Sequence, residues 1–543
     1  MESIEFHSRR SPVYGRGGMA AGSQPLAVAA GLQILAQGGS AADAAVAIAA
    51  ALNVTEPTST GLGGDAFALY FDAGTKQISA LNGSGCAPAA LTLERLQREG
   101  FEDALPPYHP YTITVPGACA AWCDLHERFG CLSLPKILAP AEKLAGEGFP
   151  VAPITAYYWQ KAAQGQLASA VNGRELTIAG RGPAAGEVFR NPGLARALRI
   201  IAEGGKQAYY QGPIADSIIA VVAEAGGCLT EADLAAHAST WEEPISVDYR
   251  GLRIWECPPN GQGLAALLAL NLLAGFDLAG LSPLSAQRLH LEIECMRLAF
   301  ADAFHFVADP AFAPAPFDAL LSPVYTDERR KLIDPSHAIQ KLAHGTPPAV
   351  SDTVYFCVVD GEGNACSFIN SNYMGFGTGI VPRGWGFSLQ NRGHNFSLQA
   401  GHPNVLAPAK RPYHTIIPAM ATYAASGDLF GPFGVMGGFM QPQGHLQVVA
   451  ALVDDLLDPQ AALDRPRFCI EPQAAGGAVA IEEGVPEETF LRLKEMGHPV
   501  EWIRGMGRSL FGRGQIIRRD PTTGVLCGGS DPRADGCAMV YLR

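Results

Sequence analysis

The sequence changes character at a short loop about two-thirds of the way along the chain. From Pro116 to about Ala343 helix-forming patterns dominate, whereas strand patterns dominate after the Gly/Pro-rich stretch 343–350. Residues 353–360 form an apolar run with β-branched and aromatic residues, and a Gly-Glu-Gly-Asn turn separates them from residues 365–370. This arrangement predicts a β-hairpin that begins directly behind an exposed loop.

Helices and strands alternate in the first third. Residues 23–36 and 40–51 are Ala-rich and each begins with a serine that can cap a helix, whereas residues 66–72 and 77–81 have strand patterns. Further predictions are helices at 264–273, 285–304 and 442–457 and a strand at 433–436. Two layers of sheet covered by helices would fit this mixture, which is α/β in class.

Composition narrows the classes of function. With 48% hydrophobic and 17% charged residues among 543, the chain has a soluble globular composition, and its net charge of −13 without a long Lys/Arg run argues against nucleic-acid binding. The longest apolar stretch, 41–54, is too short to span a membrane. The first 18 residues lack the apolar region of a secretory signal, and twelve cysteines include no CxxC pair. We therefore expect a cytoplasmic protein with free thiols.

Common catalytic signatures are missing from the sequence. It has no GxSxG elbow, no P-loop, no HExxH and no dinucleotide-type GxGxxG, and its thirteen histidines have no metal-ligand spacing, so we expect neither cofactor nor metal. The turn at 61–65 lacks the Lys and Ser/Thr that would hold phosphate, and it is expected to be either a pocket wall or a packing turn. The junction Ser351-Asp352-Thr353 joins the loop to the strand, and a threonine that opens a strand is unremarkable by itself. It becomes the candidate centre through the motifs that accompany it.

Collinear motifs along nearly the whole chain give this junction a context. They are Gly38-Gly-Ser-Ala-Ala-Asp43, Gly61-Leu-Gly-Gly64, Val115-Pro-Gly117, Asp352-Thr353, Gly363-Asn-Ala365, Phe376-Gly-Thr-Gly-Ile380, Lys410-Arg-Pro412, Gly437-Gly438 and Ser530-Asp-Pro-Arg533. Together they resemble the γ-glutamyltransferases, which are N-terminal-nucleophile hydrolases. The resemblance implies an αββα four-layer sandwich that both chains build jointly after self-cleavage.

The resemblance also assigns roles. Cleavage between Asp352 and Thr353 would give a large subunit, 1–352, and a small subunit, 353–543, that stay together as a heterodimer, which could pair further. Thr353 would be the nucleophile and its α-amine the base, with Ser371 as a second hydroxyl beside it. Gly437 and Gly438 would supply the oxyanion hole, which is also what backbone N–H groups at a strand-to-helix turn can do.

The expected substrate-binding residues depart from the transpeptidase pattern. The segment 82–88 has no arginine, although transpeptidases use one there to hold the α-carboxylate of the glutamyl group. Arg392 and Asn395 stand where transpeptidases have the Gln and Asp that hold the α-amine, and an arginine there would attract an anion instead. Asn372 and Thr415 are expected to orient Thr353 and the substrate, and His414 could reach the pocket.

The chain looks more like the acylase-type branch of the family, because the lid segment, 396–410, is short and residues 371–377 and 390–393 match that branch. Three functions follow. The first is hydrolysis, or transfer, of a γ-glutamyl or similar anionic acyl group from a small amide. The second is a non-glutamyl acylase or amidohydrolase, of the cephalosporin/glutaryl or oxamate type. The third is a non-catalytic binding protein on the same fold.

Overall fold

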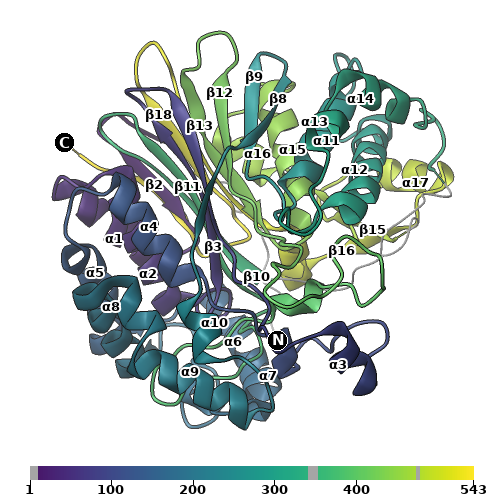
Figure 1. The fold of residues 1–543 in the computed structure, drawn as a ribbon. Coiled ribbons are helices and arrows are strands. Elements are labelled where there is room, and N and C mark those ends of the chain that lie inside the picture. Colours follow the sequence, from purple (N-terminus) through teal and green to yellow (C-terminus); the bar gives the residue numbers. More distant parts are fainter. Residues whose placement is uncertain (1–9, 340–351, 472–476, 543) are drawn as a thin grey trace.

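The computed structural model describes residues 10–339, 352–471 and 477–542, so the predicted loop 343–350 lies outside the described part. Two seven-stranded sheets are stacked face to face, and helices cover the outer face of each (Figure 1). Within both sheets every pair of neighbouring strands is antiparallel. The fold is therefore the four-layer αββα sandwich that the sequence predicts.

The first sheet contains the predicted hairpin at its centre. Its strand order is β19-β2-β10-β11-β3-β4-β7. The strands are β2 (Met19–Gly22), β3 (Asp65–Asp72), β4 (Gln77–Gly83), β7 (Thr240–Glu242), β10 (Asp352–Val359), β11 (Ala365–Tyr373) and β19 (Cys537–Val540). Because β10 pairs with β2 on one side and β11 with β3 on the other, the hairpin is inserted between strands from the first third of the chain.

The second sheet also combines distant parts of the chain, in the order β1-β18-β17-β13-β12-β9-β8. Its strands are β1 (Val13–Gly15), β8 (Ile245–Tyr249), β9 (Leu252–Glu256), β12 (Ala419–Tyr423), β13 (Leu429–Met436), β17 (Arg513–Arg519) and β18 (Leu526–Ser530). Outside the sandwich, β14 (Phe468–Ile470), β15 (Val479–Glu482) and β16 (Val500–Ile503) form a small sheet, and β5 (Phe149–Pro150) pairs with β6 (Val188–Phe189).

Apolar side chains fill the space between the sheets. Tyr355 of β10 and Ile517 of β17 belong to this cluster, and both are buried. The ring of Tyr355 lies so close to Gly434 of β13 that a Cβ at Gly434 would be 2.5 Å from it. The glycine thus allows β10 and β13 to approach, and this contact brings the start of β10 toward the end of β13.

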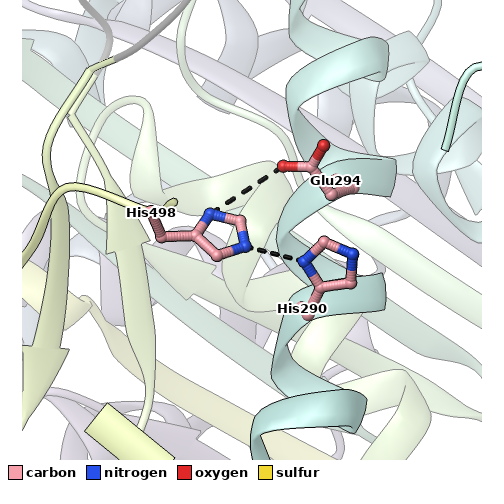
Figure 2. A group of neighbouring side chains, drawn as sticks. All are labelled: His290, Glu294 and His498. Atoms are coloured by element: carbon pink, nitrogen blue, oxygen red, sulfur yellow. Dashed lines mark hydrogen bonds and ion pairs between the residues drawn. The ribbon is translucent and has the colours of Figure 1, made fainter. Parts of the chain in front are cut away.

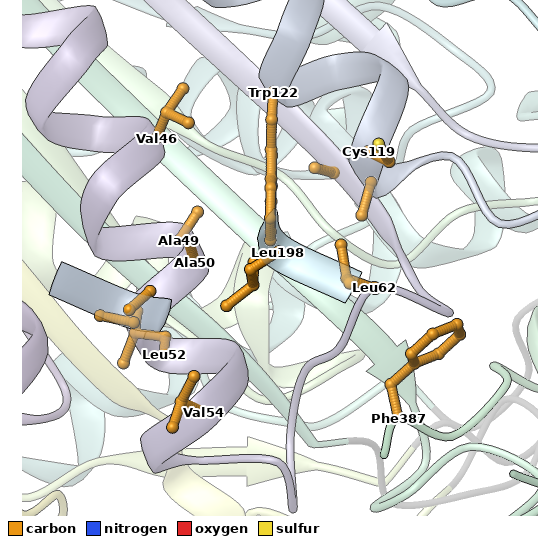
Figure 3. Close-up of a cluster of buried hydrophobic side chains, with 14 of the residues drawn as sticks. Val46, Ala49, Ala50, Leu52, Val54, Leu62, Cys119, Trp122, Leu198 and Phe387 are labelled. Carbon is orange, nitrogen blue, oxygen red and sulfur yellow. The ribbon is translucent and has the colours of Figure 1, made fainter. Parts of the chain in front are cut away.

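Helices from the first half cover the first sheet. Helix α2 lies against β10 and β11, and a capping box of Ser40 and Asp43 fixes its first turn. Ser23 was expected to cap the preceding helix, but that prediction is wrong: Gln24 is the N-cap, and the Ser23 hydroxyl donates to Glu56 at 2.5 Å. The apolar cluster between α2, α4 and α8 contains Trp122 and Leu198 (Figure 3).

The helices of this half are α1 (Pro25–Ala36), α2 (Ala41–Thr55), α3 (Leu93–Arg98), α4 (Ala118–Phe129), α5 (Leu134–Glu147), α6 (Pro153–Gln164), α7 (Gln166–Ser169), α8 (Pro192–Tyr210), α9 (Pro213–Glu224) and α10 (Glu231–Ala235), with 3₁₀ turns η1 (Pro110–Thr112) and η2 (Gly173–Leu176).

Helices α11, α15 and α16 pack on the second sheet, and α12 packs on α11 and α15 (Figure 1). The predicted helices are found with shifted ends, as α11 (Gly263–Ala274), α12 (Ala286–Phe306) and α15 (Met440–Val453). The remaining elements are α13 (Phe317–Leu320), α14 (Pro323–Arg330), α16 (Pro459–Asp464), α17 (Glu487–Glu495), η3 (Arg392–Asn395) and η5 (Gly505–Phe511). Among the described helices, none is both long and apolar enough to cross a bilayer.

Candidate active site

Thr353 lies at the start of β10, and its side chain is completely buried. The pairing with β11 shifts by one residue around it, since Asp352 pairs with Tyr373 but Val354 pairs with Asn370. The register of Val354 with Asn370 puts Thr353 opposite Ser371 on β11, and side chains that face each other across an antiparallel pair are neighbours. The hydroxyl of Thr353 lies 3.1 Å from that of Ser371.

The hydroxyl of Ser371 is held by two donors. The backbone N–H of Tyr373 donates to its Oγ at 2.8 Å, and Nη2 of Arg392 donates at 3.2 Å. A hydroxyl oxygen has two lone pairs, so these two donors can occupy both. They fix the position of the Ser371 oxygen beside Thr353 Oγ1.

Arg392 is the charged group of this cluster and is also completely buried. Its Nη1 donates to Thr415 Oγ1 at 2.7 Å, and its guanidinium lies over the ring of Tyr373, 4.4 Å from the ring centroid. Burial lowers its pKa to about 10 although the charge of Asp65 raises it, so the side chain is a cation at neutral pH. Its two side-chain hydrogen bonds use two of five N–H groups, and its Nε has no hydrogen-bond partner among the described residues, so Arg392 has donors for a further acceptor.

Asp65 and His414 form a buried pair behind the cluster. His414 Nε2 lies 3.0 Å from Asp65 Oδ2, and since its Nδ1 accepts from Ile416 N, Nε2 carries the proton and donates. Asp65 Oδ1 accepts from the backbone N–H groups of Gly85 and Gly117, at 3.2 and 3.1 Å. Burial raises the pKa of Asp65 to about 7, and burial and the charge of Arg392 lower the pKa of His414.

The sequence analysis predicted a position for His414 but no role for Asp65. The structure places Asp65 directly after the Gly-rich turn 61–64, at the first residue of β3. A charged residue in a buried position next to a glycine-rich turn was the available signal. What the sequence could not supply is its partner, which is 349 residues away.

Gly437 and Gly438 occupy the turn between β13 and α15, with φ angles of +133° and +60°. Their carbonyls accept the N–H groups of Met440 and Gln441 and so start the helix. Gln262, which the sequence analysis did not single out, connects this turn to the cluster: its Nε2 donates to the carbonyls of Gly438, at 2.8 Å, and Thr415, at 2.6 Å. The Pro/Gly-rich turn before the predicted helix at 264 was the only hint of its position.

Asn395 lies at the rim of the cluster and is tied to its neighbours. The hydroxyl of Tyr373 donates to Asn395 Oδ1 at 2.6 Å, and Asn395 Nδ2 donates to the carbonyl of Tyr413 at 3.1 Å. Both polar atoms of the amide thus have a protein partner. Tyr373 itself, which the sequence analysis missed, has a φ of +79°, a strained value that places its ring beneath Arg392.

Asn372 is not brought into this group. Neighbouring strand residues point to opposite faces, so Asn372 points away from the side on which Ser371 meets Thr353. Its Nδ2 donates to Ser388 Oγ at 3.4 Å, and its amide lies against Gly61 and Gly64. A Cβ at Gly64 would lie 2.3 Å from the Ser371 carbonyl, so the glycine turn at 61–64 is a packing turn that supports the strand carrying Ser371.

The segment that carries an arginine in transpeptidases also lies beside the cluster. Asn82 Nδ2 donates to Asn260 Oδ1 at 2.9 Å, and Asn260 Nδ2 donates to the carbonyl of Pro412 at 2.7 Å. Asn260 Nδ2 also donates to Ser84 Oγ at 3.1 Å, so Ser84 belongs to this buried polar group. The residues here are neutral, so the positive charge next to Thr353 comes from Arg392.

A pocket of about 310 Å³ opens next to the end of β11. Met374 and Gly375, which follow Tyr373, form one wall, and Thr58, Tyr108 and Lys161 contribute to the others. Its size suits a small organic molecule.

Known proteins are similar to this chain over nearly its whole length. The family model described as gamma-glutamyltranspeptidase matches residues 27–541. The glutathione hydrolase-like YwrD proenzyme of Bacillus subtilis (strain 168) is 35% identical over 523 residues, covering 95% of this chain and 96% of that protein. The acylase ACY 1 proenzyme of Pseudomonas sp. (strain SE83) is 32% identical, covering 99% and 96%.

The crystal structure of a cephalosporin acylase from Bacillus halodurans superposes with a TM-score of 0.93 at 47% identity, covering 100% of this chain and 99% of that one. Fold and sequence thus agree over essentially the whole length. The chain belongs to the gamma-glutamyltranspeptidase family of amide-cleaving enzymes, whose members include both glutathione hydrolases and acylases.

Proposed function

We propose that the chain is a self-processing amidohydrolase in which Thr353 is the nucleophile. The observation that carries the proposal is the buried contact of 3.1 Å between Thr353 Oγ1 and Ser371 Oγ. The contact places the Thr353 hydroxyl in the same buried cluster as Arg392, whose Nη2 donates to the same Ser371 oxygen. The relatives named as proenzymes are consistent with a precursor that is cut.

Cleavage of the precursor would use the same hydroxyl. Thr353 Oγ1 attacks the carbonyl carbon of Asp352, and the peptide C–N bond between Asp352 and Thr353 breaks. The proton of the hydroxyl moves to the Thr353 nitrogen. Water then hydrolyses the ester, which leaves a carboxylate on Asp352 and a free α-amine on Thr353. An α-amine has an ordinary pKa of about 7.7–8.0, so near neutral pH a useful fraction is unprotonated and can act as a base.

Turnover repeats these steps on a substrate amide. The α-amine takes the Oγ1 proton as the oxygen attacks the substrate carbonyl, and it returns the proton to the leaving amine. An acyl-threonine remains, which water hydrolyses. The N–H groups of Gly437 and Gly438, at a turn without side chains, are our candidates for the donors to the oxyanion in both steps.

The charge of the site favours an acyl group that ends in a carboxylate. Arg392 is a buried cation whose Nε has no partner among the described residues, and a carboxylate is the ligand that a guanidinium prefers. Asp65 is the carboxylate whose charge acts on Arg392, and its oxygens already accept three hydrogen bonds. An ammonium group would therefore lack a partner and would be repelled by Arg392.

We therefore place a glutaryl-type acyl group ahead of a γ-glutamyl group, since the two differ by that ammonium. The two acylases among the similar proteins support this order, and the glutathione hydrolase-like relative supports the alternative.

Intact mass on a denaturing column tests the nucleophile. Two species that correspond to residues 1–352 and 353–543 support self-cleavage before Thr353. A single full-length species after days at neutral pH would mean that Thr353 is not activated, and would favour a binding protein on this fold.

Substrate class is tested separately with glutaryl, γ-glutamyl and butyryl anilides, which differ only at the far end of the acyl group. We expect the highest kcat/KM for the glutaryl compound. A preference for the γ-glutamyl compound would contradict the assignment to Arg392, and equal rates for glutaryl and butyryl would show that the carboxylate is not recognised.

A further inference from the structure

A second group of chemically reactive side chains lies outside the sandwich, between α12 and the small three-stranded sheet. His290 and Glu294 are one turn apart on α12, and His498 follows α17 (Figure 2). All three are buried, and one ligand atom of each lies within 4.8 Å of the others. The sequence spacing did not indicate this group, since His498 is 208 residues from His290.

The protonation of the two histidines follows from their partners. His290 Nε2 lies 2.7 Å from the carbonyl of Asp334, which can only accept, so Nε2 carries the proton and Nδ1 has the lone pair. His498 Nε2 lies 2.8 Å from that lone pair and must donate to it. If His498 is neutral, its Nδ1 is then unprotonated, and it faces Glu294 Oε1 across 3.9 Å.

Two acceptors thus face each other in the interior. Nδ1 of His498 has no hydrogen-bond partner among the described residues, although only 2% of the residue is exposed. An unsatisfied buried acceptor beside a carboxylate is costly, and a cation between the groups would remove the cost. We propose that His290, Glu294 and His498 form a binding site for a divalent transition metal of the zinc type.

The donor set and its surroundings fit such an ion. Two imidazoles and one carboxylate are a common set of three protein ligands for zinc. The second atoms of two ligands are already held from behind, as in metal sites: His290 Nε2 by the carbonyl of Asp334, and Glu294 Oε2 by the N–H of Ile339 at 2.8 Å. These contacts aim His290 Nδ1 and Glu294 Oε1 at the same space.

Binding requires one small movement and one change of tautomer. Two nitrogens at about 2.0–2.1 Å from a tetrahedral zinc are roughly 3.3 Å apart, so the 2.8 Å contact between the histidines must widen by about half an ångström. The proton on His498 Nε2 is exchanged for one on Nδ1, so His498 stays neutral and no net proton is released. Nδ1 then carries a proton on the side that faces the carboxylate, so two acceptors no longer face each other.

Arg297 is the competing cation. Its Nη1 donates to Glu294 Oε1 and its Nη2 to the carbonyl of Gly477, and both hydrogen bonds are long, at 3.4 Å. A metal ion would replace Arg297 at Oε1, while the contact with Gly477 can remain.

Zinc binding to the purified full-length protein, after treatment with a chelator, tests the site. We expect about one equivalent per chain and a higher Tm with zinc chloride than with the chelator alone. Cobalt(II) should give the absorption bands of a tetrahedral complex. Less than a tenth of an equivalent of bound zinc, with no change in Tm, would overturn the proposal without any variant.

Variants identify the ligands. Glu294→Gln keeps the shape and the acceptor for Ile339 but removes the charge, and His498→Gln removes the imidazole. Each should weaken zinc binding at least about tenfold, since even the partners behind metal ligands are worth that much. His305→Gln, on the same helix but outside the group, is the matched control. Equal affinity of all four proteins would mean that zinc binds elsewhere. Thr353→Ala should bind zinc like the wild type, so this result does not depend on catalysis.

Discussion

The hydroxyl groups of Thr353 and Ser371 lie 3.1 Å apart at the one place where the pairing of β10 and β11 slips by a residue. The register of Val354 with Asn370 puts Thr353 opposite Ser371, and side chains that face each other across an antiparallel pair are neighbours. The slip follows at once, since Asp352 pairs with Tyr373. The contact on which the proposed chemistry depends thus lies at the edge of the regular pairing of the central hairpin.

Ser371→Ala tests this contact. The N–H of Tyr373 and Nη2 of Arg392 would each lose an acceptor, and an unsatisfied buried donor costs about 1–3 kcal/mol. We expect slower cleavage of the precursor, a lower kcat and a lower Tm. Ser371→Thr keeps the hydroxyl and should have a cleavage rate, kcat and Tm close to those of the wild type. Cleavage of Ser371→Ala at the wild-type rate would show that Thr353 needs no second hydroxyl.

Thr353→Ala removes the proposed nucleophile. We expect a single full-length chain by mass spectrometry and no measurable hydrolysis of any anilide. Thr353→Ser is the matched variant, because it restores a hydroxyl at the same atom, and it should be cut. A Thr353→Ala protein that still splits before residue 353 would exclude this residue from the cleavage.

Arg392→Ala tests the recognition of the acyl end. A hydrogen bond to a charged group is worth about 1.5–3 kcal/mol, so KM for a glutaryl anilide should rise roughly 10- to 100-fold. KM for the neutral butyryl anilide should stay nearly constant, and self-cleavage should be disturbed less. Arg329→Lys, at an ion pair with Asp302 far from Thr353, serves as the control. A similar rise in KM for both anilides would mean that another residue binds the carboxylate.

Gly437→Ala tests the turn after β13. At its φ of +133° any side chain is strained, at a cost of about 1–3 kcal/mol, and the added Cβ would lie 3.2 Å from Gly512 Cα and 3.3 Å from Met440 Cβ. We expect both a lower Tm and a loss of kcat. Gly212→Ala has a similar φ, +124°, in open space, so it should lower the Tm alone. Equal kcat in the two variants would argue against an oxyanion role.

The pH dependence of stability tests the buried Asp65. Burial raises its pKa from 3.8 to about 7, so between these values the folded protein holds a proton that the unfolded chain has released. This contribution to stability is therefore complete below about pH 4 and is lost as the pH rises through 7. In denaturant titrations, the free energy of unfolding of Asp65→Asn should fall less over this pH range than that of the wild type. If the two proteins have the same dependence on pH, Asp65 is ionised throughout and is held in that state by Arg392 and its three hydrogen-bond donors.

The central hairpin could be predicted from the sequence because its signals are local. The apolar run after residue 352 and the Gly-Glu-Gly-Asn turn define both strands, and β10 and β11 are found within a few residues of the predicted ends. The same holds for α2, whose capping box lies within four neighbouring residues. Ser23 failed as a cap because its hydroxyl has a stronger acceptor, the carboxylate of Glu56, in another part of the chain.

The residues that organise the site were harder to predict. Asp65 and Gln262 act through partners that are 349 and 153 residues away, and a local sequence pattern does not indicate such distant partners. Tyr373 depends on a backbone conformation that its residue type disfavours. Asn372 was placed near the nucleophile by its neighbour in sequence, but strand alternation turns it to the other side.

The position of the two ends of the described chain has a consequence for how the protein could be made. Arg10 donates to the carbonyl of Gly536, the N–H of Tyr541 donates to Gly18, and a Cβ at Gly15 would touch Val540, so the first and last strands run next to each other. A short linker could join them, and a circularly permuted gene could begin at Thr353 instead. Such a chain would expose the α-amine of Thr353 once the initiator methionine is removed, and catalysis could then be studied apart from self-cleavage.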